Sequence, residues 1–322
     1  MESKDFLQID NIESVVTELQ EFIKYNVENK FKRKGVIVGL SGGVDSAVTA
    51  TLAVRALGSE RVFGLIMPEK ESSPKSREFA ELLAKKLGIK TEVIDLTEIL
   101  ESFRVYSIRE KILKEKFPEF DANCKYRIKI PDELLKKNSM SIPFLEIEND
   151  SKQIFKFRLS LEEYLSIYAA TSIKHRVRMT TLYYNGEKNQ YLVMGSTNKS
   201  EAIQGYFVKY GDGGVDLEPL WNLYKTQIYQ IAEFLDIPCE IKQRKPSPDT
   251  WSMDVSDEEF FFGMSYEMID VLCYAMEQNI SLKEICYNKN MNYDEAERAW
   301  HMIIRKKESS QHMREMPPKF NF

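Results

Sequence analysis

The chain has 322 residues, which is enough for one sizeable core and favours one large α/β domain or one domain with an appendage. It carries 45 Lys and Arg against 50 Asp and Glu, a net charge of −5, so the composition disfavours binding of a nucleic-acid backbone. The first ten residues contain no apolar signal segment, and no run of the sequence approaches the roughly 20 apolar residues of a membrane span. We therefore expect a cytoplasmic protein with neither a nucleic-acid nor a membrane partner.

The cysteine spacing indicates neither disulfides nor a metal site. The four cysteines, Cys124, Cys239, Cys273 and Cys286, lie far apart in the sequence, and none belongs to a C-x-x-C pair. This spacing argues against a disulfide framework and against a zinc site. We expect all four to be buried, reduced thiols.

The first part of the sequence alternates strand and helix patterns. Apolar residues between Ile12 and Ile23 recur at helical spacing and predict a packing helix. After it we expect strands at 36–40, 62–67 and 91–95 and helices at 47–57 and 76–87, each helix ended by a glycine. This β-α-β-α-β order predicts a parallel sheet whose ligand site lies beyond the carboxyl ends of the strands.

This alternation is interrupted from about residue 98 to residue 165. There, residues 126–131 and 143–160 alternate like exposed antiparallel strands on either side of a polar segment at 132–140. We interpret residues from about 103 to 159 as a β-rich insertion. It is either a peripheral hairpin on a tolerant surface loop or a cover over the ligand site.

The alternation resumes after the insertion. We expect a helix at 162–179, a strand at 191–195 and a helix near 226–235. The polar, proline-containing tail at 307–322 is expected to be a mobile segment or a closing lid. Together the elements predict an α/β fold in one domain over residues 1–322, with a doubly wound, mostly parallel, Rossmann-like sheet.

The sequence SGGVDS, residues 41–46, stands where the first strand meets the N-terminus of a helix. Its closely spaced backbone N–H groups form an anion cradle, and the hydroxyls of Ser41 and Ser46 can donate to phosphate oxygens. Asp45 would repel a phosphate unless a hard cation lay between them, so it predicts Mg²⁺. A tight turn capped by this aspartate is the alternative. The Walker pattern is absent, which argues against a γ-phosphate-cleaving NTPase of that class.

A second polar segment, residues 194–227, follows a buried strand and has neither helical nor strand periodicity. A loop of this kind is typical of a binding site. Glu201 could supply a second oxygen ligand to the metal, and Lys225 could neutralise phosphate charge that the first loop has no lysine to meet. For the sequence YGDGG at 210–214 alone, a solvated turn is the alternative.

These segments resemble a known family. GLSGGVDSA at 39–47 and GSTNKSEAIQGYFVKYGDGGVDLEPLWNLYKTQ at 195–227 are similar to segments of the ammonia-dependent NAD⁺ synthetases, in the N-type ATP pyrophosphatase, or PP-loop, superfamily. The resemblance continues in the same order through SIKHRVRM at 172–179, RKPSPDTW at 244–251 and DEEFFFGMSYEMID at 257–270. It implies the adenine nucleotide alpha hydrolase-like form of the α/β fold.

The resemblance also implies a reaction. ATP would adenylate the nicotinate carboxyl of deamido-NAD⁺, pyrophosphate would leave, and ammonia would attack the acyl adenylate to form the amide. The chain would then be a carbon–nitrogen ligase that uses ATP as co-substrate and Mg²⁺ as cofactor. The family further implies a homodimer, and because the chain lacks room for a glutaminase domain, ammonia would be free or come from a separate glutaminase.

Position by position, the resemblance assigns roles to residues of this sequence. The residues expected to hold ATP are Gly39, Leu40, Ser41, Gly42, Gly43, Val44, Asp45, Ser46, Ser196, Lys225 and Ser247. Asp45 and Lys225 are expected to be catalytic, and Asp45 and Glu201 to bind Mg²⁺. Contacts to the dinucleotide are expected from Arg176, Lys209, Asp216, His312 and Arg314.

Two departures from the family keep other functions open. Met313 stands where a lysine is typical, although Arg314 offers a cation one residue later, and the insertion is longer than the usual connection. One alternative is therefore a paralogous amide synthetase that acts on another carboxylate, such as a sugar acid. Another is a PP-loop enzyme that adenylates tRNA, which would need a basic face and reactive cysteine pairs. A non-enzymatic nucleotide-binding protein is disfavoured by the intact Asp45, Glu201 and Lys225.

Overall fold

The structure is a computed structural model that describes residues 6–131, 135 and 143–320; the polar segment expected at 132–140 lies outside the described residues except for Leu135. At its centre is a parallel sheet of four strands in the order β3-β2-β1-β7. The strands are β1 (Gly35–Gly39), β2 (Val62–Ile66), β3 (Lys90–Val93) and β7 (Tyr191–Met194). The expected parallel sheet is therefore confirmed.

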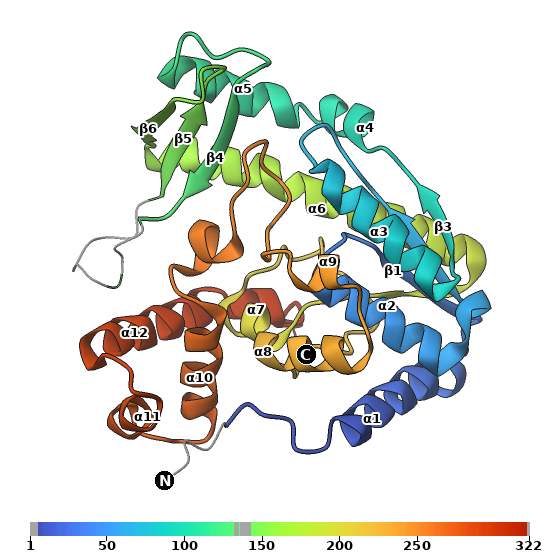
Figure 1. Cartoon of the computed structure of the whole chain (residues 1–322). Coiled ribbons are helices and arrows are strands. Elements are labelled where there is room, and N and C mark those ends of the chain that lie inside the picture. The colour runs from blue at the N-terminus through green and yellow to red at the C-terminus, as the bar shows by residue number, and fades with distance from the viewer. Residues whose placement is uncertain (1–5, 132–134, 136–142, 321–322) are drawn as a thin grey trace.

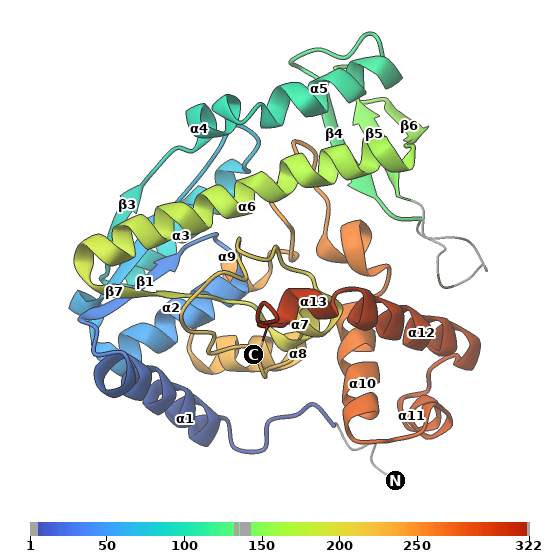
Figure 2. The same cartoon turned by 180° about the vertical axis from the view of Figure 1, so that it is seen from behind.

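Helices cover both faces of this sheet, as Figures 1 and 2 show. On the face to which Val36 and Val38 point, the covering helices are α1 (Ile12–Tyr25), α2 (Val44–Leu57), α3 (Pro74–Leu87) and α8 (Lys225–Phe234). On the face to which Ile37 and Val193 point, they are α4 (Thr97–Ser102) and the long α6 (Leu161–Asn189). Because β1 is buried on both faces, its sequence is apolar without alternation.

The junction between β1 and α2 differs from expectation in one respect that matters for the site. The helix expected at 47–57 begins at Val44, so Asp45 and Ser46 lie in its first turn and not in the loop. Before it, Gly42 has a φ of +73°, and a Cβ at this position would lie 2.4 Å from the carbonyl oxygen of Ser76. Only glycine fits this turn without a shift of the backbone.

The insertion contains the expected antiparallel strands and also a helix that the sequence analysis did not predict. Its sheet has the order β4-β5-β6, and its helix precedes that sheet in the chain. These elements are α5 (Val105–Lys116), β4 (Lys125–Lys129), β5 (Phe144–Glu148) and β6 (Ile154–Arg158). Their apolar side chains form one core with Ile167 of α6 and with Trp251 and Val255, so the insertion packs onto the main body.

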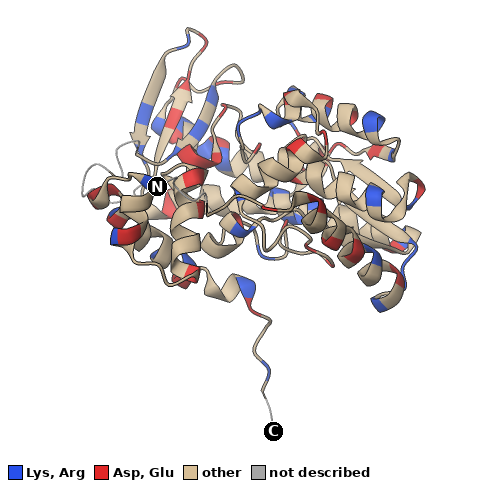
Figure 3. Cartoon of the chain, turned by 60° about the horizontal axis from the view of Figure 1, so that its bottom comes forward, with Lys and Arg blue, Asp and Glu red and all other residues tan. Residues whose placement is uncertain are grey.

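The described chain after β7 contains helices and no further strand. Besides α8, its helices are α7 (Lys199–Gln204), α9 (Cys239–Lys242), η3 (Glu258–Phe262), α10 (Tyr266–Glu277), α11 (Leu282–Lys289), α12 (Tyr293–Ser309) and α13 (Gln311–Arg314). Two short helices lie earlier in the chain, η1 (Asn26–Lys30) and η2 (Ser59–Arg61). The tail expected at 307–322 thus begins as helix, and the chain leaves the body only after α13 (Figure 3). That the tail acts as a lid stays a prediction.

Two further expectations concern surface chemistry. All four cysteines are unpaired, but Cys239 is exposed and not buried as expected, because it lies at the start of the short surface helix α9. Among the helices that the structure describes, none combines the length and the apolar character needed to cross a membrane.

Candidate active site

The carboxyl ends of β1, β2 and β7 open into one pocket, where a parallel sheet of this kind places its ligand site. Its walls come from the β1–α2 turn, the segment after β2, α6, the loop after β7 and the segment 244–261. The expected site residues that line it are Gly39, Leu40, Ser41, Gly43, Val44, Asp45, Ser46, Ser196, Glu201, Lys225 and Ser247. The structure therefore brings together the residues expected to hold ATP and metal, while Gly42 lies under the turn beside Ser76.

The β1–α2 turn is built as an anion cradle. No side chain caps the N-terminus of α2, so the amides of its first turn are left to bind an external group. Ser41 Oγ lies 3.0 Å from Ser46 Oγ, and Ser46 Oγ donates to the carbonyl of Gly43 at 3.0 Å. These bonds hold both hydroxyls beneath the turn, where they can turn to an anion bound at the helix N-terminus.

Opposite the cradle, a buried lysine joins three helices. Lys225, the first residue of α8, donates through Nζ to Asp45 Oδ2 at 2.5 Å and lies 4.0 Å from Glu201 Oε1. Asn198, the N-cap of α7, donates to the other oxygen of Asp45 at 3.0 Å and forms a reciprocal capping box with Glu201. The N-termini of α2, α7 and α8 thus converge on one carboxylate pair.

This cluster contains two carboxylates, Asp45 and Glu201, and one ammonium group, that of Lys225. Burial and the neighbouring Asp45 raise the pKa of Glu201 well above its ordinary value. Burial alone would lower the pKa of Lys225, but the charges of Asp45 and Glu201 outweigh it and hold that pKa above the usual range. Among the described residues no group of three or more acidic, His or Cys side chains could hold a metal by itself. Two crowded carboxylates fit a Mg²⁺ ion whose other ligands are phosphate oxygens and water.

Arg244, a cation that the sequence analysis did not single out, lies beside the cradle. Arg244 donates through Nη2 to Ser76 Oγ at 2.8 Å, and its Nη1 lies 3.5 Å from the carbonyl oxygen of Ser41. Arg244 also forms an ion pair with Asp249 at 3.6 Å, and it lines the pocket. The residue belongs to the segment 244–251 that already carried the family resemblance, so that segment was the available signal.

Two other polar groups of the pocket were missed. Asp257 is buried and accepts hydrogen bonds from Tyr206 Oη at 2.7 Å and Tyr266 Oη at 3.0 Å, and burial raises its pKa. On α6, His175 Nδ1 lies 3.2 Å from Asp212 Oδ1, and both residues line the pocket. Both groups lie in segments that the sequence analysis had quoted, where single residues gave no reason to prefer them over their neighbours.

The residues expected to contact the dinucleotide lie elsewhere, and none of the five lines the pocket. Arg176 is exposed on α6. Asp216 accepts hydrogen bonds from the amide of Val193 at 2.9 Å and from Tyr183 Oη at 3.0 Å, which ties its loop to β7. Their assignment to the dinucleotide stays a prediction.

The other three are engaged with the C-terminal helices. Lys209 Nζ donates to the carbonyl of His312 at 2.6 Å, and His312 itself is exposed. Arg314 donates to the carbonyl of Ala202 at 3.0 Å and to Ser310 Oγ at 2.8 Å. The guanidinium of Arg314 therefore holds the end of α7, so in this arrangement it is occupied by protein acceptors.

Comparison with known proteins places the chain in a family. The model of the NAD synthase family matches residues 15–140 and 131–317. The NH(3)-dependent NAD(+) synthetase of Rhizobium rhizogenes is 34% identical over 310 residues, which cover 96% of this chain and 92% of that protein. The protein of the same name from Thermotoga maritima is 37% identical over 273 residues, 83% of this chain and 88% of that protein.

Solved structures agree in fold. An NMN synthetase from Francisella tularensis has a TM-score of 0.67 at 22% identity, covering 97% of this chain and 99% of that chain. An NH3-dependent NAD synthetase from Campylobacter jejuni has a TM-score of 0.64 at 24% identity, covering 96% and 99%. With the family model and the close relatives matching most of its length, the chain belongs to the NAD synthase family.

Proposed function

We propose that the chain is an ammonia-dependent NAD⁺ synthetase. It uses ATP to adenylate the nicotinate carboxyl of deamido-NAD⁺, and ammonia then displaces AMP to form the amide. Family membership supports this proposal. The observation that carries it is the cluster of Lys225, Asp45 and Glu201 facing an anion cradle at the N-terminus of α2.

The charges of the pocket suit a pyrophosphate leaving group. The first-turn amides of α2 bind phosphate oxygens, and Lys225 and Arg244 place positive charge on two sides of the cradle. We propose that Asp45 and Glu201 hold Mg²⁺, which would neutralise the charge that develops on pyrophosphate. Adenylation then needs no Walker lysine, because the bond that breaks is the one to the α-phosphate.

The acyl partner is proposed to occupy the side of the pocket nearest α6. Tyr168, Phe207 and Val215 offer apolar surface there, and the pair of His175 and Asp212 offers polar groups. The names of the relatives favour neither a sugar acid nor tRNA as the acceptor. In the view of Figure 3, Lys and Arg alternate with Asp and Glu over the helices.

The dinucleotide contacts, the oligomeric state and the nitrogen source are also part of the proposal. The dinucleotide contacts of Arg176, Lys209, Asp216, His312 and Arg314 are predictions from family resemblance. So is the homodimer, which light scattering of the purified protein would detect as twice the chain mass of 37.6 kDa. The nitrogen source is proposed to be free ammonia or ammonia delivered by a separate glutaminase.

The test is a product assay. Purified protein with ATP, Mg²⁺ and ammonium should release AMP and pyrophosphate when deamido-NAD⁺ is added, and should form one NAD⁺ for each AMP. Nicotinate mononucleotide serves as a competing acceptor because an NMN synthetase has a similar fold, and a panel of sugar acids tests the paralogue alternative. Turnover with one of these acids and none with deamido-NAD⁺ would contradict the proposal.

A further inference from the structure

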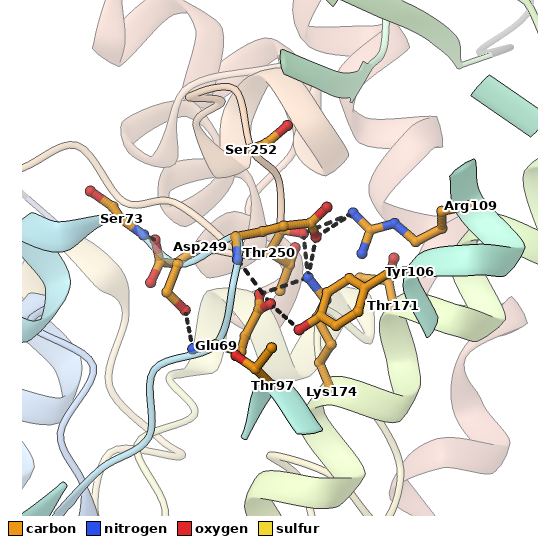
Figure 4. Close-up of polar contacts among 12 residues, drawn as sticks. Glu69, Ser73, Thr97, Tyr106, Arg109, Thr171, Lys174, Asp249, Thr250 and Ser252 are labelled. Carbon is orange, nitrogen blue, oxygen red and sulfur yellow. Dashed lines mark hydrogen bonds and ion pairs between the residues drawn. The ribbon is translucent and has the colours of Figure 1, made fainter. Parts of the chain in front are cut away.

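A second cluster of buried charged side chains contacts Thr250, a residue that lines the pocket (Figure 4). It consists of Glu69 and Glu71 from the segment after β2, Arg109 from α5 and Lys174 from α6, and we call these four residues the ionic brace. Lys174 Nζ lies 2.7 Å from Glu69 and 2.6 Å from Glu71, and Arg109 lies 2.9 Å from Glu71. The side chains of Arg109, Lys174 and Glu69 are 0% exposed.

Both cations of the ionic brace donate hydrogen bonds to the same backbone carbonyl. The carbonyl oxygen of Thr250 accepts hydrogen bonds from Lys174 Nζ at 3.0 Å and from Arg109 Nη2 at 3.2 Å. The guanidinium of Arg109 also packs against two aromatic rings, 5.0 Å from the centre of Tyr126 and 4.9 Å from that of Trp251. Two cations and two rings therefore fix the position of the chain at residues 250 and 251.

Thr250 and the residues before it belong to the pocket. Ser247, Asp249 and Thr250 line it, and Asp249 accepts a hydrogen bond from the amide of Ser73 at 3.0 Å. Arg244, which reaches the cradle, comes a few residues earlier in the chain. A displacement of the Thr250 carbonyl would therefore move groups that face the proposed ATP.

This stretch has little structure of its own. Residues 245–256 contain no helix or strand, so their order depends on what they contact. Much of that contact is with β4 of the insertion. The amide of Met253 donates to the carbonyl of Tyr126 at 3.1 Å, the amide of Tyr126 donates to Ser252 Oγ at 2.9 Å, and Arg127 donates to the carbonyl of Asp254 at 2.5 Å.

We propose that the insertion is a built-in positioning element for the ATP site. Arg109 acts through the Thr250 carbonyl, and β4 acts through residues 252–254. Together they hold the 245–256 stretch in its binding arrangement before ATP arrives. A loop that is already ordered loses less conformational entropy when it binds its ligand, so removal of Arg109 weakens ATP binding without removing any group that touches ATP. This inference rests on the proposed function only in naming ATP as the ligand.

The test exchanges Arg109 in the full-length protein. In Arg109→Met, Glu71 keeps Lys174 as its partner and an apolar side chain remains against the two rings. We expect the KM for ATP to rise about tenfold while kcat changes by less than about twofold. Proteolytic cleavage within 245–256 should become faster, and saturating ATP should restore protection. Arg109→Lys, which keeps the charge and a donor, should recover most of the affinity.

The matched control is Arg158→Met, the same exchange on the exposed side of β6 in the same insertion. It should alter neither the KM for ATP nor the cleavage rate. Ser252→Ala provides a second, milder perturbation that acts only through the bonds to Tyr126, and it should raise the cleavage rate by about two- to threefold.

Two outcomes would overturn the inference. In the first, Arg109→Met lowers the melting temperature but leaves the KM for ATP and the cleavage pattern unchanged well below that temperature. In the second, Arg109→Met does not fold and Ser252→Ala leaves cleavage within 245–256 unchanged. The proteolysis is carried out with ATP and without an acyl acceptor, so its result does not depend on whether deamido-NAD⁺ is the true substrate.

Discussion

The two buried charge clusters of this protein differ in balance. The site cluster of Asp45, Glu201 and Lys225 has two carboxylates for one cation, whereas the ionic brace has two of each. Burial raises the pKa of Glu201, but in the ionic brace Lys174 outweighs burial and lowers the pKa of Glu69. Glu69 is the more buried of the two carboxylates, so the balance of charge around each carboxylate, and not its burial, decides the direction of its pKa shift. A cluster with equal numbers of acids and bases is neutral by itself, whereas an acid-rich cluster is suited to receive a cation with its ligand.

The strongest test of the balanced cluster is Lys174→Met. It leaves Glu69 and Glu71 buried beside each other with only Arg109 as counter-charge, and we expect it to lower the free energy of unfolding by about 3–5 kcal/mol. Urea denaturation measures this. In Lys152→Met, where the lysine pairs with Glu148 on the surface, the change should stay within about 0.5 kcal/mol. Equal effects in the two variants would remove the distinction between a buried and an exposed pair.

A substitution in the acid-rich site cluster should change the reaction rate and not the stability of the fold. Asp45→Asn keeps the size of the side chain and the acceptor for Asn198 but removes one negative charge from the proposed Mg²⁺ site. Loss of one such electrostatic contact should reduce the rate of pyrophosphate release by about 10²- to 10³-fold. The melting temperature should stay close to that of wild type. Asp10→Asn, on an exposed residue, is the control and should have the wild-type rate.

Stabilisation of the fold by a bound ligand tests the metal assignment of the site cluster without an activity assay. If Asp45 and Glu201 hold Mg²⁺, then Mg²⁺ with pyrophosphate at 100 times its dissociation constant should stabilise the protein by about 2.7 kcal/mol, seen as a higher melting temperature. Glu201→Gln should lose most of this shift, while Arg158→Met, on the exposed side of β6, should keep it because Arg158 does not line the pocket. A full shift in Glu201→Gln would contradict the assignment of that carboxylate to the metal.

A smaller effect is expected from Glu218, whose buried Oε1 has no protein partner and whose pKa burial raises to about 8. Because the folded state binds this proton more tightly than the unfolded state, the stability it contributes is complete below about pH 4.5 and is lost as the pH rises toward 8. Glu218→Gln cannot titrate, so at pH 9 it should be more stable than wild type by at least about 1 kcal/mol.

That difference should shrink as the pH falls and disappear near pH 4.5, which thermal unfolding between pH 4.5 and 9 would show. The control is Glu240→Gln, on an exposed residue of α9, which should follow the wild-type curve. A constant offset between Glu218→Gln and wild type at every pH would mean that the amide changes packing and that the carboxyl does not titrate in this range.

Much of the fold could be read from local pattern. The buried strand β1, the helix after it and the turn between them follow from an apolar run, a glycine pair and a helical repeat within 25 residues. Helix α5 does not follow from local pattern, because its buried residues include a charged side chain: they are Val105, Arg109, Ile112 and Leu113. A buried arginine breaks the expected periodicity, and its partners Glu71 and Thr250, far away in the sequence, explain its burial.

The sequence by itself therefore determined the parallel sheet, the position of the anion cradle and the family, since each depends on residues that are neighbours along the chain. Tertiary structure decided which charged residues reach the pocket. Arg244 lies at the cradle, whereas Arg314, equally cationic in sequence, is bound by the carbonyl of Ala202. The physical reason is that a charge in a folded protein goes to whichever partner the packing of distant segments brings within hydrogen-bonding distance, and no local pattern encodes that pairing.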